Sequence, residues 1–221
     1  MTPLFDAVLF DFDGTVVDSS EGIFNSVLYA LDAFGYKAPE AEALRYFIGP
    51  PLAHSFQHLF GVDEPRAQAL VGKYRERYRT QGVREVQLYD GILSLLTALR
   101  EGGVRLGVAS SKPAPFIREI LSLLGIDSFF ESIAGIGFAP NQNEPDKEAL
   151  IRQAIQGLGL SAQERALMVG DRHFDIDGAH RAGLPCAAVL YGFGSRAEFE
   201  RAGAEYIVSS PEELRPIVLQ G

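Results

Sequence analysis

The stretch VLFDFDGTVVDSS, residues 8–20, places Asp11 and Asp13 directly behind an apolar run that is typical of a buried strand. Side chains two positions apart on an extended chain point to the same side, so both carboxylates can face one ligand. Gly14 follows them, and a glycine lets the backbone turn sharply at that point. The stretch therefore predicts a strand that ends in a polar site.

The remainder of the chain predicts a sheet covered by helices. Beyond residue 86, short runs rich in valine and isoleucine alternate with longer segments of helical spacing. This alternation is typical of a doubly wound, Rossmann-like α/β fold with a parallel sheet. Residues 19–85 contain helical segments with almost no strand signal. We therefore expect an α/β core domain of residues 1–18 and 86–221, with an inserted all-helical cap domain at residues 19–85.

Composition and charge favour a small-molecule partner. The 221 residues are 47% hydrophobic and carry a formal net charge of -9, which works against extended binding of nucleic acid or of an anionic membrane. No apolar run approaches the roughly 18 residues of a membrane span. A single cysteine, Cys186, excludes an intramolecular disulfide. We expect a cytoplasmic protein, either a monomer or a homodimer.

Polar residues follow several predicted strands. The run AVLF leads to Asp11 and Asp13, LGVA leads to Ser110 and Ser111, and LMV leads to Asp171. Because ligands of open parallel sheets bind outside the carboxyl ends of the strands, we expect these side chains to converge. Hydrolysis of a phosphate ester needs a nucleophile, a proton donor, a cation and hydrogen-bond donors for the nonbridging oxygens. These strand ends can supply all of them.

Further charged residues suit a metal and a phosphate. Asp171 and Asp175 are separated by about one helical turn, and carboxylate oxygens are ligands that Mg²⁺ prefers. Lys112 lies two residues after Ser110, and Lys147 begins a predicted helix. Either lysine can approach a bound phosphate as a point charge.

These motifs resemble those of the haloacid dehalogenase superfamily of phosphotransferases. DFDGTVVD resembles its nucleophile motif, VASS its serine or threonine motif, and GDRHFD the acidic motif that completes its metal site. The resemblance covers essentially the whole chain, because the helical insertion after the first strand resembles the cap module of the family. FIGPPL and GDRHFDIDGAHRAG resemble the phosphoglycolate phosphatase branch.

The resemblance implies a role for each aspartate. Asp11 attacks phosphorus to form an aspartyl-phosphate, and Asp13 protonates the leaving alcohol and then activates water. Mg²⁺ is held by the Asp11 carboxylate, the Asp13 main-chain carbonyl and Asp171, while Asp175 positions water on the metal. Ser110 donates a hydrogen bond to the phosphoryl oxygens.

The resemblance also implies a lysine that offsets the charge of nucleophile and phosphate. The branch commonly has Lys-Pro-x-Pro there, whereas this sequence has NEPDKEAL at residues 143–150. We assign Lys147 to this role, because it lies before the helix that precedes MVGD, and we keep Lys112 in reserve.

The predicted substrate-binding residues are Gly14, Ser111, Arg45 and Gly49. The last two belong to the cap segment RYFIGPPL, which on one interpretation closes over the substrate, with Arg45 contacting a carboxylate. On the other interpretation, Gly49 and the prolines simply end one helix and begin the next.

The function that follows is a Mg²⁺-dependent phosphatase acting on a small phosphorylated metabolite, with phosphoglycolate as the first candidate. Retention of Asp13 favours a phosphatase or a phosphomutase over dehalogenases and phosphonate hydrolases of the same superfamily, which lack this aspartate. A phosphosugar mutase is the first alternative, since it keeps Asp11 and Asp13 but protects the aspartyl-phosphate from water. A receiver-like phosphoacceptor module in signalling is the second.

Overall fold

The computed structural model describes residues 2–138 and 146–220, so residues 143–145 of the NEPDKEAL segment lie outside the described part of the chain. The chain divides into two compact units. Met1–Val17 and Leu88–Gly221 form the first unit, and Asp18–Gln87 forms the second. The sequence predicts boundaries at residues 18/19 and 85/86, whereas the compact units divide at 17/18 and 87/88.

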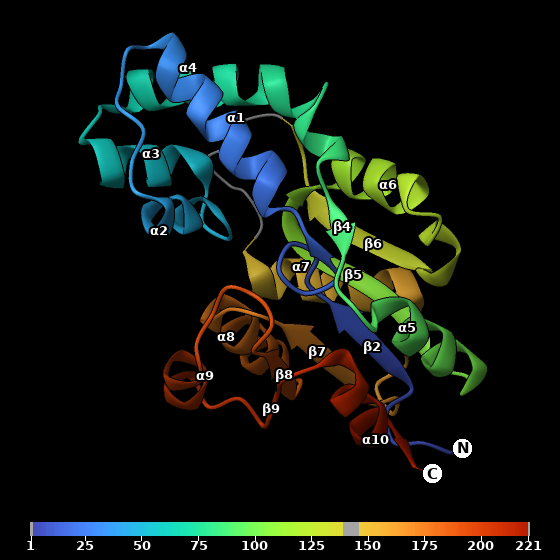
Figure 1. The fold of residues 1–221 in the computed structure, drawn as a ribbon. Coiled ribbons are helices and arrows are strands. Elements are labelled where there is room, and N and C mark those ends of the chain that lie inside the picture. Colours follow the sequence, from blue (N-terminus) through green and yellow to red (C-terminus); the bar gives the residue numbers. More distant parts are fainter. Residues whose placement is uncertain (1, 139–145, 221) are drawn as a thin grey trace. The chain divides into compact units, whose positions relative to one another are not determined.

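The first unit contains a six-stranded sheet in the order β6-β5-β2-β7-β8-β9 (Figure 1). All of its pairings are parallel. The chain starts at the centre with β2, moves outward to one edge, returns beside β2 as β7 and moves to the other edge, which confirms the doubly wound α/β fold class. The strands are Ala7–Phe10 (β2), Arg105–Pro113 (β5), Ser132–Ile136 (β6), Ala166–Gly170 (β7), Cys186–Val189 (β8) and Tyr206–Val208 (β9).

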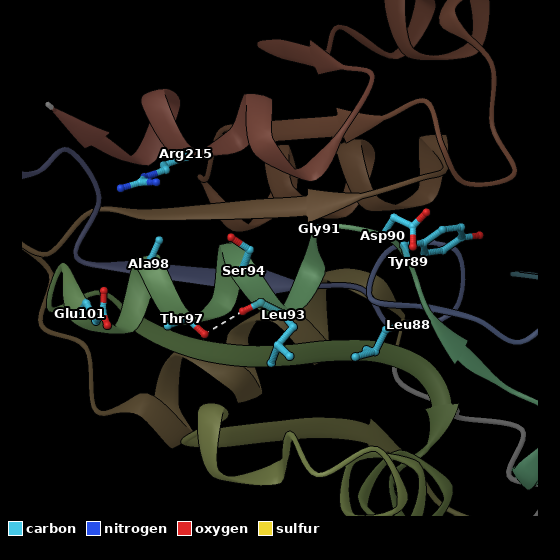
Figure 2. A pocket seen from close by; sticks show the side chains of 10 residues that line it. All are labelled: Leu88, Tyr89, Asp90, Gly91, Leu93, Ser94, Thr97, Ala98, Glu101 and Arg215. Carbon is cyan, nitrogen blue, oxygen red and sulfur yellow. Dashed lines mark hydrogen bonds between the residues drawn. The ribbon is translucent and has the colours of Figure 1, made fainter.

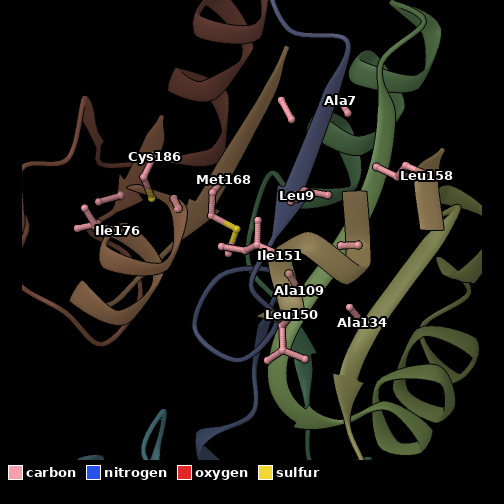
Figure 3. Packing of buried hydrophobic residues seen from close by; sticks show 14 of the residues in the cluster. Ala7, Leu9, Ala109, Ala134, Leu150, Ile151, Leu158, Met168, Ile176 and Cys186 are labelled. Carbon is pink, nitrogen blue, oxygen red and sulfur yellow. The ribbon is translucent and has the colours of Figure 1, made fainter. Parts of the chain in front are cut away.

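The central strand β2 is buried on both faces. Its four residues have no exposed surface, as is typical of a strand in a parallel sheet covered on both sides. Ala7 and Leu9 belong to a cluster with residues of α7, α8 and α9, part of which is drawn in Figure 3. These helices are Lys147–Leu158 (α7), His173–Ala182 (α8) and Arg196–Ala202 (α9). Val8 and Phe10 point to the opposite face because side chains alternate along a strand.

The other helices of this unit are α5 (Ile92–Glu101), α6 (Ala114–Leu123) and α10 (Arg215–Val218). Near the chain ends, β1 (Thr2–Pro3) pairs antiparallel with β10 (Leu219–Gln220). The short strands β3 (Val17–Asp18) and β4 (Gln87–Leu88) pair where the chain passes between the units. Short 3₁₀ helices occur at Asp127–Phe129 and Pro211–Leu214.

Cys186 lies in β8 and is completely buried among apolar side chains. Burial raises the pKa of its thiol well above the ordinary value, and the negative charges of Asp175 and Glu205 raise it further. A buried, protonated thiol behaves as a small apolar group, so Cys186 is part of the core.

The second unit, as far as the structure describes it, is helical. Its α-helices are Ser20–Ala33 (α1), Ala41–Leu44 (α2), Leu52–Phe60 (α3) and Glu64–Tyr78 (α4), with 3₁₀ helices at Arg45–Phe47 and Gly82–Arg84. The side chain of Asp63 caps α4 by accepting a hydrogen bond from the Arg66 amide at 3.0 Å. Across residues 2–138 and 146–220, we find no helix whose length and apolar character would let it span a membrane.

We predict that Leu9→Ala lowers the free energy of unfolding by about 3 kcal/mol, because it opens a cavity beneath the central strand. Leu123→Ala on α6 is the matched control, since Leu123 is 53% exposed and its truncation changes stability by less than about 0.5 kcal/mol. Urea unfolding of both variants checks this. Equal losses in the two variants would contradict the central position of β2 in the core.

Candidate active site

The turn behind β2 carries the first two predicted residues. The amide of Asp11 donates to the carbonyl of Val169 at 2.8 Å, which ties the end of β2 to that of β7. Gly14 has a φ of 89°, in the left-handed region that favours glycine. A side chain at Gly14 would also collide with the carboxylate of Asp171. The chain therefore reverses directly behind Asp13, with the Asp171 carboxylate packed against the turn.

Three carboxylates converge at this point. Asp11, Asp171 and Asp175 each offer an oxygen, and these atoms all lie within 4.8 Å of one another. The three residues are 9%, 1% and 1% exposed, respectively. The strand order explains the convergence, because β2 and β7 are neighbours at the point where the direction of winding reverses. A cluster of buried acidic oxygens at such a point suits a divalent cation.

The carboxylate of Asp175 has two separate surroundings. Its Oδ2 accepts hydrogen bonds from the amides of Asp171 at 3.1 Å and Arg172 at 3.0 Å, which fixes the turn that begins α8. Its Oδ1 is buried and accepts no hydrogen bond within the described residues, although the Lys147 ammonium lies 2.7 Å away. Asp175 thus caps the helix through Oδ2 and faces the Lys147 ammonium and the acidic cluster through Oδ1.

The ammonium group of Lys147 lies among these acids. It donates to Asp11 Oδ1 at 2.9 Å and to the carbonyl of Ala109 at 3.0 Å. Burial lowers the pKa of Lys147, but the carboxylates of Asp11 and Asp175 outweigh this effect and raise it above the ordinary value. A side chain at Gly178 of α8 would collide with the Lys147 stem, so the glycine leaves room for it. Lys147 is therefore a permanent cation beside Asp11.

Lys112 pairs with the other aspartate of the turn. Its Nζ donates to the two carboxylate oxygens of Asp13 at 2.8 and 3.0 Å. Both side chains are largely buried, with 5% of Lys112 and 16% of Asp13 exposed. The two lysines between which the sequence left a choice thus have different partners: Lys147 contacts Asp11, and Lys112 contacts Asp13.

Burial raises the pKa of Asp171 well above its usual range, and the charges of Asp175 and Asp11 raise it further. Burial likewise raises the pKa of Asp175, although the Lys147 ammonium opposes this effect. The cluster therefore holds more negative charge than its surroundings stabilise. A bound cation would relieve that repulsion.

The two serines lie near the end of β5, which continues to Pro113 with a register shift relative to β6 between Ser110 and Pro113. Ser110 is 2% exposed, and its Oγ accepts a hydrogen bond from the Lys112 amide at 3.3 Å. Ser111 is exposed. Burial within the strand end thus distinguishes Ser110 from Ser111.

Arg45 and Gly49 belong to the second unit. Arg45 begins the 3₁₀ helix Arg45–Phe47 and lies 3.8 Å from Glu42 in an exposed ion pair. Gly49 is exposed and has a φ of 104°, so it makes a turn that few other residues adopt. Their predicted role in binding substrate stays a prediction.

Sequence reasoning missed a backbone contact on Asp171 and the loop that supplies it. The amide of Phe193 donates to Asp171 Oδ2 at 2.8 Å. The hydroxyl of Tyr191 donates to the carbonyl of Thr15 at 3.0 Å, and this holds the same loop against the turn behind β2. No particular side chain marks a backbone amide that donates to a site. The closely spaced glycines of YGFG, residues 191–194, are the sequence signal that could have indicated this loop.

A groove of about 660 Å³ lies elsewhere in the first unit, alongside α5 (Figure 2). Leu93 is 52% exposed there, and the hydroxyl of Thr97 donates to its carbonyl at 2.8 Å. None of the predicted site residues is among those that line this groove. Its lining residues are Leu88, Tyr89, Asp90, Gly91, Leu93, Ser94, Thr97, Ala98, Glu101 and Arg215.

Comparison with known proteins shows the family of this chain. A family model described as haloacid dehalogenase-like hydrolase matches residues 8–189. A 5′-nucleotidase of Pseudomonas aeruginosa is 42% identical over 211 residues, which are 96% of this chain and 94% of that protein. The tyrosine-protein kinase PtkA of Mycobacterium bovis is 40% identical over 192 residues, which are 87% of this chain and 64% of that protein.

Solved structures with the same fold include predicted phosphatases. The crystal structure of a predicted phosphatase from Clostridium acetobutylicum is 40% identical, covers 96% of both chains and superposes with a TM-score of 0.88. A predicted phosphoglycolate phosphatase from Haemophilus somnus has a TM-score of 0.83 over 96% of this chain and 97% of that chain, but at 23% identity it shares the fold alone. The chain belongs to the haloacid dehalogenase-like hydrolase family, as an enzyme of its phosphatase group.

Proposed function

We propose that this protein is a Mg²⁺-dependent phosphomonoesterase that forms an aspartyl-phosphate on Asp11. The observation that carries the proposal is the position of the Asp11 carboxylate. It lies 2.9 Å from the buried ammonium of Lys147 and within the acidic cluster of Asp171 and Asp175. An anionic nucleophile beside a fixed cation suits attack on a phosphoryl group, whose own negative charge must be offset.

The donor set fits Mg²⁺. The carboxylates of Asp11 and Asp171 and the main-chain carbonyl of Asp13 would hold the ion, and the carboxylate of Asp175 would complete its surroundings. The available ligands are hard oxygens, and burial, followed by the charges of Asp175 and Asp11, raises the pKa of Asp171, so a bound cation would offset an unfavourable buried charge. When bound, the ion neutralises charge on the phosphoryl group and the nucleophile.

The chemistry proceeds in two displacements. A carboxylate oxygen of Asp11 attacks phosphorus, and the bond to the ester oxygen breaks as Asp13 gives that oxygen its proton. Asp13 then takes a proton from water, whose oxygen attacks the phosphorus of the aspartyl-phosphate. Inorganic phosphate leaves, and the carboxylate of Asp11 is regenerated. Lys112, 2.8 Å from Asp13, holds the acid and base in place beside the nucleophile.

The proposed substrate is a small phosphorylated metabolite. The relative with 42% identity is named a 5′-nucleotidase, whereas the predicted phosphoglycolate phosphatase from Haemophilus somnus is only 23% identical. We therefore place nucleoside 5′-monophosphates ahead of phosphoglycolate, the first candidate from the sequence.

We predict that Asp11→Asn lowers phosphate release by at least about 1,000-fold, because it keeps the shape of the side chain but removes the anionic nucleophile. The assay covers nucleoside monophosphates, phosphoglycolate, sugar phosphates and pyrophosphate, each with Mg²⁺ and with a chelator. We expect the wild-type protein to turn over only with Mg²⁺.

Equal release by wild type and Asp11→Asn would contradict the proposal. Isomerisation of a sugar phosphate without phosphate release would favour the mutase alternative. Stable phosphorylation of the wild-type chain with negligible turnover would favour a phosphoacceptor.

The two buried lysines have distinguishable roles. We predict that Lys147→Met lowers kcat/KM by at least about 100-fold, because it removes the cation that offsets charge at Asp11. Lys112→Met frees the Asp13 carboxylate and leaves that cation in place, so its loss is smaller. Steady-state kinetics of both variants on the best substrate checks this order. A larger loss in Lys112→Met would make Lys112 the phosphate-neutralising lysine.

Replacing Asp171 tests the charge of the cluster. The folded state raises the pKa of Asp171, so it binds a proton there more tightly than the unfolded chain does. The stabilisation that this proton gives is complete below the unfolded pKa of about 3.9 and is lost as the pH rises through the pKa of the folded state. Asparagine does not titrate, so Asp171→Asn does not lose stability in this way as the pH rises. In chelator, we predict that the melting temperature of Asp171→Asn, relative to wild type, increases between about pH 4 and about pH 8.

Excess Mg²⁺ should reverse this difference at neutral pH, since wild type gains binding energy that the variant lacks. Melting curves across pH, with and without Mg²⁺, provide the measurement. A relative melting temperature that decreases as the pH rises would refute the repulsion argument.

A further inference from the structure

We propose that Glu198 of α9 is a positioning residue for the segment Asp171–Asp175, which supplies two of the metal-binding carboxylates. This inference rests on the proposed function, because it concerns the same Mg²⁺ site. Glu198 belongs to none of the motifs that identify the family, and it lies 23 or more residues beyond that segment.

A single oxygen of Glu198 holds the middle of the segment. Glu198 Oε1 accepts hydrogen bonds from the His173 amide at 2.8 Å and from the Arg172 Nε at 3.1 Å. The ring Nδ1 of His173 lies 2.8 Å from the same oxygen and donates to it in the tautomer that carries the proton there. Since the Glu198 side chain is only 18% exposed, solvent weakens these contacts little.

The segment is held from two sides. On the inner side, Asp175 Oδ2 accepts hydrogen bonds from the amides of Asp171 and Arg172. On the other side, Glu198 accepts hydrogen bonds from the His173 amide and from the Arg172 side chain. Two successive amides therefore donate to two different carboxylates. This arrangement fixes the backbone between Asp171 and Asp175, and with it the direction of both metal-binding side chains.

Restraint is needed because the two acids repel each other. Their carboxylates belong to a buried cluster in which oxygens lie within 4.8 Å. Without a restraint, this repulsion would favour open arrangements of the segment, and a binding ion would then have to reorder it. A restraint from outside the cluster keeps the ligands in place beforehand and so lowers the cost of binding.

Glu198 is itself firmly placed. The Ser195 hydroxyl caps α9 by accepting a hydrogen bond from the Glu198 amide at 3.3 Å. The next residue, Phe199, is completely buried in the core cluster that contains residues of α8. Burial raises the pKa of Glu198, but hydrogen bonds from His173 and the charge of Arg172 outweigh it and hold the pKa below the ordinary value. The carboxylate is thus anchored and ionised.

The expected effect is on metal affinity. Removing a partner that orients metal ligands typically costs about 10- to 100-fold in affinity. We predict that Glu198→Ala weakens Mg²⁺ binding by at least about tenfold, while saturating Mg²⁺ restores most of the kcat. Glu198→Gln keeps an acceptor for the His173 amide but loses the negative charge, so its loss lies between those of alanine and wild type.

The experiment uses calorimetric titration of the full-length protein with Mg²⁺, together with the Mg²⁺ concentration that gives half-maximal phosphate release. Melting temperatures with and without Mg²⁺ separate a positioning effect from a general loss of stability. Glu200→Ala is the matched control, because Glu200 is an exposed glutamate of the same helix. We expect its Mg²⁺ affinity to equal that of wild type.

Wild-type Mg²⁺ affinity in Glu198→Ala and Glu198→Gln would overturn the inference and leave the proposed function intact. A lower melting temperature with unchanged affinity would also overturn it, since that is the result of a merely structural role. If Glu198→Ala fails to fold, Glu198→Gln decides the question. Absence of Mg²⁺ binding by the wild-type protein would instead overturn the proposed function, and the inference with it.

Discussion

Three buried carboxylates share the ends of β2 and β7 with the ammonium group of Lys147. Buried charge is costly unless it is paired, and one lysine cannot offset three acids. The surrounding structure makes this arrangement possible. The Phe193 amide stabilises Asp171, and amides of the turn before α8 stabilise Asp175. A bound divalent cation would offset the negative charge that these contacts leave, as the proposed function requires.

The order of the strands in the sheet brings these groups together. β2 and β7 are neighbours in the sheet although more than 150 residues separate them in the sequence. Their apolar residues bury the centre of the sheet, so the polar residues that follow emerge together at one edge. Gly14 permits the close approach of Asp171, and Gly178 makes room for Lys147. Core packing and site geometry therefore depend on the same few strand ends.

Much of this could be predicted from the sequence, because strand periodicity and polar residues at strand ends are local signals. The parallel α/β fold and the convergence of Asp11 with Asp171 followed from such signals. The partners of Lys112 and Lys147 did not, since they depend on side-chain placement across elements. The Phe193 amide was equally hidden, because every residue except proline has that donor.

The buried thiol of Cys186 has a practical consequence. The chain has one cysteine, and it is completely buried with a raised pKa, so thiol-reactive reagents meet little thiolate. We therefore expect that maleimide dyes do not react with the native protein. A cysteine introduced at Tyr29 of the helical unit and another at Leu123 of the sheet unit, which are 37% and 53% exposed, would carry a fluorescent pair without background labelling. Energy transfer between the dyes could then follow the separation of the two units in solution while substrate is turned over.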